Sequence, residues 1–176
     1  MSKGQRTKSE SRETKDPASG RRIRQITCHP SIHHHPFFFV PAYDRAMKRL
    51  IFVSYRTGTP QIYVVGADGL NLAKRSSDGY CDRPTWSPAP YNEIAYSARS
   101  GPGFDIHVID LATGQTSSLT NGEGTNESPA YSPNGRHIVF TSSRSGKVQV
   151  FTMARDGKNV RQITRTGNNE KPDWSR

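Results

Sequence analysis

The sequence predicts an all-β fold: a partial (open) β-propeller of about three four-stranded blades plus the start of a fourth, with a disordered N-terminal tail. Three observations lead to this prediction. A phrase of about 44 residues recurs along the chain, its β-prone stretches alternate with turn residues, and no segment has the apolar period of a helix. Repeats of this kind are typical of propeller blades, of which a closed ring has about four to eight.

Three short patterns mark the repeat: a Pro-x-aromatic-Ser pattern, an apolar alternating run and an Arg-x-Gly pair. The first begins at Pro84, Pro129 and Pro172, with a degenerate copy at Pro36 followed by Phe37 and Phe38; the second begins at Ile51, Ile94 and Ile138; the third begins at Arg56, Arg99 and Arg144. Because the spacing of all three patterns agrees to within two residues, each copy is expected to form one structural unit.

The copy at 117–159 shows why each unit is expected to hold four strands. After the stretch "PAYS", residues 138–143 and 148–153 are rich in β-branched and aromatic residues, and 160–164 continues the pattern. Tight turns are expected between these strands at 132–135, 144–147 and 155–158, where proline presets φ and glycine accepts a positive φ. A single four-stranded sheet cannot bury both faces, so neighbouring copies are expected to cover one another.

The chain therefore divides into a tail and a series of blades. Residues 1–22 are expected to be a disordered basic tail, because residues 1–24 carry eight Lys or Arg against three Asp or Glu and no apolar period. Residues 23–176 are expected to form the blades. Their approximate bounds are 25–72, 73–116, 117–159 and, for an incomplete fourth, 160–176.

Composition narrows the class of protein. The net charge is +10, no run of 18 apolar residues could span a membrane, and the N-terminus lacks an apolar signal-peptide core, so as written the chain is expected to be cytoplasmic. Cys28 and Cys81 lack the spacing of a zinc site. The sequence leaves open whether these cysteines are two reduced thiols or form a disulfide between units. No aromatic residue lies in the tail to stack on bases, and no specific nucleic-acid partner is expected.

Five short motifs lie in the later copies of the repeat: Leu119-Thr120, Ser132-Pro133-Asn134-Gly135, Arg144-Ser145-Gly146, Asp156-Gly157 and Ile163-Thr164. On these motifs, residues of about 76–176 resemble the C-terminal β-propeller of the TolB family, with its WD40-like repeats. Asn134 departs from the family's usual aspartate. Residues 22–65 are instead similar to the first blade of oligogalacturonate lyases, although none of that family's metal-binding residues can be placed on this chain.

The TolB resemblance implies a non-catalytic protein-interaction or scaffold module of the Tol-Pal envelope system, located in the periplasm. Its partner would be a protein or peptide docking on one propeller face, and self-association could complete the ring. The lyase resemblance implies an alternative, a fragment of an oligogalacturonate-lyase-like propeller enzyme acting on acidic oligosaccharides. A truncated or hybrid reading frame is a third interpretation.

Strand order predicts where a binding site would lie. In an antiparallel blade, the loop entering the first strand and the loop between the second and third strands lie at the same end, so their side chains should share one rim. The rim candidates are Arg56, Arg99, Arg144, Asp82, Glu127 and Glu170. These arginines could face a ligand or pair with carboxylates of neighbouring blades, and the sequence leaves both open.

Catalytic residues are not assigned, and no cofactor is expected apart from a divalent metal at the histidine cluster. The candidates there are His29, His33 and His35, because imidazole is a common metal ligand. Adjacent residues of a strand point to opposite faces, so at most two of the three consecutive histidines could share an ion, and His29 would add another ligand.

Overall fold

The computed structural model describes residues 1–36, 40–77 and 79–175, and the regular structure in these ranges is all β-strand. The first blade contains β3 (His33–His34), β4 (Arg49–Ser54), β5 (Gln61–Gly66) and β6 (Ala73–Lys74). The second contains β7 (Cys81–Trp86), β8 (Glu93–Ser100), β9 (Gly103–Asp110) and β10 (Thr116–Ser118). The third contains β11 (Asn126–Tyr131), β12 (His137–Ser142), β13 (Gln149–Ala154) and β14 (Arg161–Gln162).

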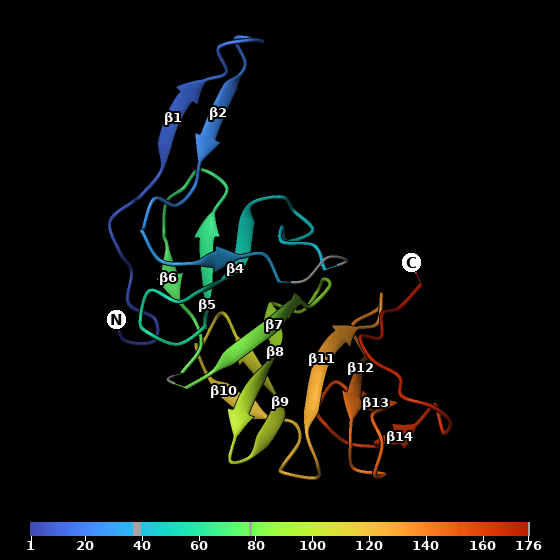
Figure 1. Ribbon diagram of the computed structural model, residues 1–176. Coiled ribbons are helices and arrows are strands. Elements are labelled where there is room, and N and C mark those ends of the chain that lie inside the picture. Colours follow the sequence, from blue (N-terminus) through green and yellow to red (C-terminus); the bar gives the residue numbers. More distant parts are fainter. Residues whose placement is uncertain (37–39, 78, 176) are drawn as a thin grey trace.

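Each blade is an antiparallel four-stranded sheet whose strand order follows the sequence. The three sheets succeed one another around an arc (Figure 1), and none of them closes into a barrel. The predicted fold class, a partial and open propeller, is confirmed. Phe37 and Phe38 of the degenerate repeat lie outside the described residues. No helix long and apolar enough to cross a membrane occurs in the part of the chain that the structure describes.

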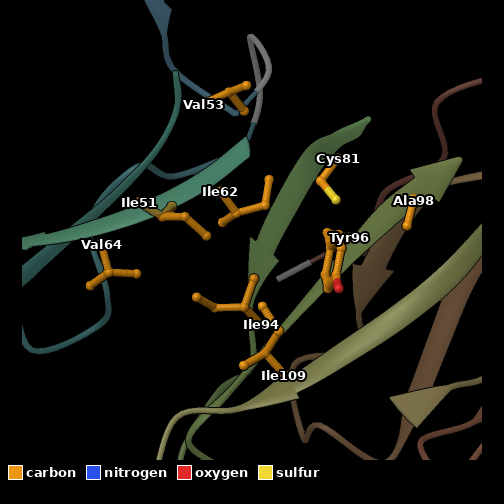
Figure 2. Close-up of a cluster of buried hydrophobic side chains, with 9 residues drawn as sticks. All are labelled: Ile51, Val53, Ile62, Val64, Cys81, Ile94, Tyr96, Ala98 and Ile109. Carbon is orange, nitrogen blue, oxygen red and sulfur yellow. The ribbon is translucent and has the colours of Figure 1, made fainter. Parts of the chain in front are cut away.

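The apolar core lies between the sheets. Figure 2 shows one cluster, in which side chains of the first blade meet side chains of the second; its members are Ile51, Val53, Ile62, Val64, Cys81, Ile94, Tyr96, Ala98 and Ile109. A second cluster joins the second and third blades through Ala95, Ile106, Val108, Tyr131, Ile138, Phe140, Phe151 and Met153. Burial therefore depends on stacking, because each sheet supplies only half of a cluster.

The predicted turn at 132–135 is confirmed and also serves packing. Gly135 has a φ of 69°, a left-handed conformation that glycine adopts without strain. A Cβ at this position would lie 2.5 Å from the ring of Tyr91 in the second blade. Glycine is thus required both by the turn and by the close approach of the neighbouring blade.

The N-terminal segment differs from the expected disordered tail. Backbone hydrogen bonds join Gly4 N–H to the Lys74 carbonyl at 2.8 Å and Thr7 N–H to the Leu72 carbonyl at 2.9 Å, so the segment runs along the outer edge of the first blade. Further on, β1 (Arg12–Lys15) pairs with β2 (Arg22–Gln25) in an exposed hairpin that projects from the blades (Figure 1).

The apolar side of the first blade explains this course. Tyr63, Val65 and Leu72 form a third cluster on the face turned away from the second blade, and Met1 and Ile26 pack against it. Composition alone cannot reveal such a contact, because the face that needs covering is created by strands about 60 residues away in the sequence. Cys28 and Cys81 are not joined by a disulfide in this arrangement.

Candidate interaction site on the inner strands

The register of the blades places the two sets of predicted rim loops at one end. The start of the first strand pairs with the end of the second in each blade: His33 with Ser54, Cys81 with Ala98 and Asn126 with Ser142. The loop that enters the first strand therefore lies beside the loop that follows the second. This is the geometry on which the rim prediction depends.

Two of the three rim arginines are committed to contacts within the chain. Arg56 forms an ion pair with Glu10 at 2.6 Å, and its guanidinium carbon lies 4.9 Å from the ring centroid of Tyr63. Arg144 forms an ion pair with Glu123 at 2.8 Å and lies 5.2 Å from the ring centroid of Phe151. Their side chains are 4% and 17% exposed, which leaves little surface for a ligand.

The ion pair with Arg56 also lowers the pKa of Glu10. Burial by itself would raise the pKa of Glu10, but the hydrogen bond and the positive charge of Arg56 outweigh burial and hold this pKa below its ordinary value. Glu10 thus stays ionised and ties the N-terminal segment to the first blade.

The remaining four rim candidates lie in different surroundings. Arg99 and Glu170 are exposed, and Arg99 lies 5.9 Å from the ring centroid of Phe104. Asp82 accepts a hydrogen bond from the backbone N–H of Arg83 at 2.7 Å. Glu127 forms an ion pair with Arg83 at 3.0 Å, which joins the third blade to the second. Three of the six rim candidates, Arg56, Arg144 and Glu127, are thus used in ion pairs within the chain.

A pocket of about 190 Å³ lies further in, at the inner strands. Arg83 of β7, residues 128–130 of β11, residues 171–173 and Val40 line it. The lining residues come from four successive copies of the repeat, so the pocket lies where the inner edges of the blades meet. Its cationic groups are Arg83 and Lys171, which directly follow the rim candidates Asp82 and Glu170 in the sequence.

A backbone feature repeats around this pocket. Arg83, Ser128 and Lys171 have φ angles of 51°, 56° and 55°, and each precedes the repeated proline. The register shifts at this point in both β7 and β11, as in a β-bulge. A left-handed conformation costs a residue with a Cβ about 1–2 kcal/mol. The signal that could have found these residues is their shared position directly before the proline.

The histidine cluster is only partly assembled. The ring centroids of His29 and His33 are 6.1 Å apart, and both ring nitrogens of His33 are buried without a hydrogen-bond partner among the residues that the structure describes. Burial, and then the charge of Arg56, lower the pKa of His33. Over the described ranges, no three His, Cys, Asp or Glu side chains, His35 included, are grouped as a metal site would require.

Comparison with known proteins places this geometry in a family. The model of the TolB β-propeller domain matches residues 74–176. An uncharacterized protein of Agrobacterium fabrum is 42% identical over 79 residues, which are 45% of this chain and 27% of that protein. The Tol-Pal system protein TolB of Francisella tularensis subsp. mediasiatica is 30% identical over 108 residues, 59% of this chain and 25% of that protein. The chain thus spans about a quarter of the length of these relatives.

Solved structures agree with both predicted resemblances. A structure provisionally assigned as TolB from Agrobacterium tumefaciens has a TM-score of 0.66 at 29% identity, over 70% of this chain and 45% of that chain. An oligogalacturonate lyase in complex with manganese has a TM-score of 0.75 at 14% identity, over 93% of this chain and 49% of that chain. At that low identity, the second likeness shows the fold alone. The family match covers more than half of the chain, and the chain therefore belongs to the TolB β-propeller domain family.

Proposed function

We propose that this chain is a non-catalytic protein-interaction module, and that a partner protein of the cell envelope docks at the inner strands of its blades. The pocket formed by four successive repeats carries the proposal. Rigid strands position its groups, and loops or edges held on such a scaffold are common binding places. The Tol-Pal name of the TolB relatives supports a periplasmic partner and location.

Selection from a random peptide library displayed on phage tests this function. The immobilised chain is expected to enrich peptides that bind in solution with micromolar affinity, as measured by fluorescence anisotropy. Binding should be lost when the chain is unfolded in urea. A selection that enriches nothing above the bare support, repeated on independently purified protein, would contradict an interaction module.

Self-association that completes the ring is a further part of the proposal. Val160 and Ile163, at the open end of the third blade, are 37% and 54% exposed. Exposed apolar residues beside a sheet edge favour pairing with another chain. Size-exclusion chromatography with light scattering should show a discrete dimer that Ile163→Lys converts to a monomer. If the unmodified chain is a monomer at all concentrations, the proposed self-association is wrong.

The alternative is a lyase-like enzyme acting on acidic oligosaccharides. Its support is the ring of His33, which lies close to His29 and whose buried nitrogens have no hydrogen-bond partner within the described ranges, together with the net charge of +10, which would attract anionic sugars. Incubation with oligogalacturonate and Mn²⁺, followed by absorbance of unsaturated uronides, tests it. No product after long incubation, and no metal retained after dialysis, would remove this candidate.

A further inference from the structure

The residues at one position of the repeat have a strained backbone, and they line the pocket at the inner strands. Arg83, Ser128 and Lys171 are left-handed although glycine at these positions would relieve the strain. β-Bulges change the direction in which side chains point. Backbone strain at equivalent positions of the repeat therefore suggests that the direction of these side chains has a function. Two of the three are long cationic side chains from different elements, and both line the same pocket.

We propose that this pocket binds the carboxylate of an aspartate or glutamate side chain in an extended segment of a partner protein. This inference rests on the proposed interaction function and names the chemistry of the partner. Arg83 and Lys171 supply the complementary charge, because a carboxylate pairs with guanidinium and ammonium groups through short, charge-assisted hydrogen bonds.

Two acidic groups lie near these cations, and each already makes a contact within the chain. Glu127 and the hydroxyl of Ser128 both contact Nη1 of Arg83, at 3.0 and 2.7 Å. A guanidinium has five N–H donors in a rigid fork, so its other nitrogens remain suited to a second carboxylate. Asp173, which also lines the pocket, accepts the backbone N–H of Trp174 at 2.9 Å. The lining thus holds two cationic side chains against one carboxylate.

The size of the pocket selects a single side chain. Its volume of about 190 Å³ lies below the roughly 300–1,000 Å³ of sites for larger small molecules and near the ~150 Å³ of a cavity that holds benzene. Pro129, Ala130 and Pro172 give it apolar walls. These walls suit the methylene groups of an acidic side chain, while the cations meet its carboxylate.

An NMR titration of the ¹⁵N-labelled chain tests the proposal. The probes are N-acetyl-glutamate N-methylamide and the matching glutamine compound. Saturable shifts are expected at the amides of Ser128, Ala130 and Lys171 with the glutamate probe, and about ten-fold weaker binding with glutamine, the difference expected for losing a hydrogen bond to a charged group. Lys171→Gln should weaken binding of the glutamate probe by a similar factor. Arg83→Lys should also weaken its binding, because the planar guanidinium fork is lost.

Arg99→Gln is the matched control, because Arg99 is exposed and outside the pocket while the change in net charge is the same as in Lys171→Gln. Its affinity for the glutamate probe should equal that of the unmodified chain. Absence of saturable shifts, equal binding of both probes, or an equal effect of Arg99→Gln would overturn the carboxylate pocket. A peptide selection that yields binders without acidic residues would do so as well, while leaving the interaction function standing.

Discussion

Trp86 and Trp174 occupy the same position of the repeat and make the same hydrogen bond to the preceding copy. The indole N–H of Trp86 donates to the Ala42 carbonyl at 3.0 Å, and that of Trp174 donates to the Ala130 carbonyl at 3.1 Å. At the intervening position, Tyr131 donates its hydroxyl to Glu93 at 3.2 Å. The aromatic residue of each Pro-x-aromatic-Ser pattern is therefore a tie between neighbouring blades as well as a packing group.

Replacing Trp86 with phenylalanine should destabilise the fold by roughly 2 kcal/mol. The Ala42 carbonyl keeps the backbone N–H of Ile51 but loses its indole donor, and Arg49 loses the indole face, whose centroid lies 4.9 Å from its guanidinium carbon. Urea unfolding followed by circular dichroism measures the change. Trp174→Phe is the matched control and should cost less, because Trp174 lies in the last segment of the chain rather than between two complete sheets. Equal losses at both sites would contradict the argument.

The pair of Glu10 with Arg56 predicts an acid-sensitive N-terminal segment. The folded state lowers the pKa of Glu10 below its ordinary value of 4.5, so the pair stabilises the folded state above that pH and is lost as pH falls through the folded value. Hydrogen exchange at Gly4 and Thr7 should therefore keep its protection down to about pH 4.5 and lose it below. In Glu10→Gln the protection should be low already at neutral pH, whereas in Glu13→Gln, a change in the exposed hairpin, it should match the unmodified chain.

At the scale of the element, each blade contains a buried polar latch between its third strand and the loop after its fourth. In the second blade, the Thr120 hydroxyl donates to Asp105 at 2.6 Å and accepts the backbone N–H of Ile106 at 2.9 Å. Ser76 with Gln61, and Thr164 with Gln149, repeat these contacts in the first and third blades. This explains why a hydroxyl recurs at the "LT" position of the motif.

Replacing Thr120 with valine should destabilise the second blade by about 2 kcal/mol, because the shape is kept but a buried N–H and a buried carboxylate each lose a partner. The midpoint of urea unfolding reports the loss. Thr120→Ser keeps the hydroxyl and should lose less than 1 kcal/mol, roughly the value of the missing methyl group. A serine variant as unstable as the valine variant would show that packing, and not the latch, matters here.

At the scale of the whole molecule, the two ends of the arc are covered to different extents. The first blade is covered on its outer face by Met1 and Ile26 and along its edge by residues 3–8. On the side of the third blade, the segment that carries Trp174 donates a hydrogen bond to Ala130, and Ile163 remains 54% exposed. The N-terminal segment is therefore a cap made by the chain itself, and the proposed self-association would use the other end of the arc.

Deletion of residues 1–10 should uncover the first blade and leave the buried Arg56 without its carboxylate. We expect a lower thermal midpoint and stronger binding of the dye ANS, since the cluster of Tyr63, Val65 and Leu72 becomes accessible. Deletion of residues 11–25, the exposed hairpin, joined by a short glycine linker, is the control and should change neither quantity, because Met1 and Ile26 both remain in the chain. An unchanged midpoint after removal of the cap would contradict its structural role.

Much of this architecture could be predicted from local pattern. The blade strands, the turn at Gly135 and the spacing of the aromatic residues follow from alternation, turn chemistry and period, which involve neighbours in sequence. The site was harder to predict. The repeated arginines are conspicuous in sequence, yet Arg56 and Arg144 are occupied by Glu10 and Glu123, whose distances along the chain carry no pattern.

The sequence by itself determined the repeating unit and the family, because periodicity and turn residues are properties of short segments. Only the tertiary structure decided that a basic, polar N-terminal segment caps the first blade, and that Arg83, Ser128 and Lys171 gather at one pocket. The physical reason is that both depend on faces and edges that exist only after the sheets have stacked. Contacts between residues more than 40 positions apart leave no local trace when each side chain is also compatible with an exposed position.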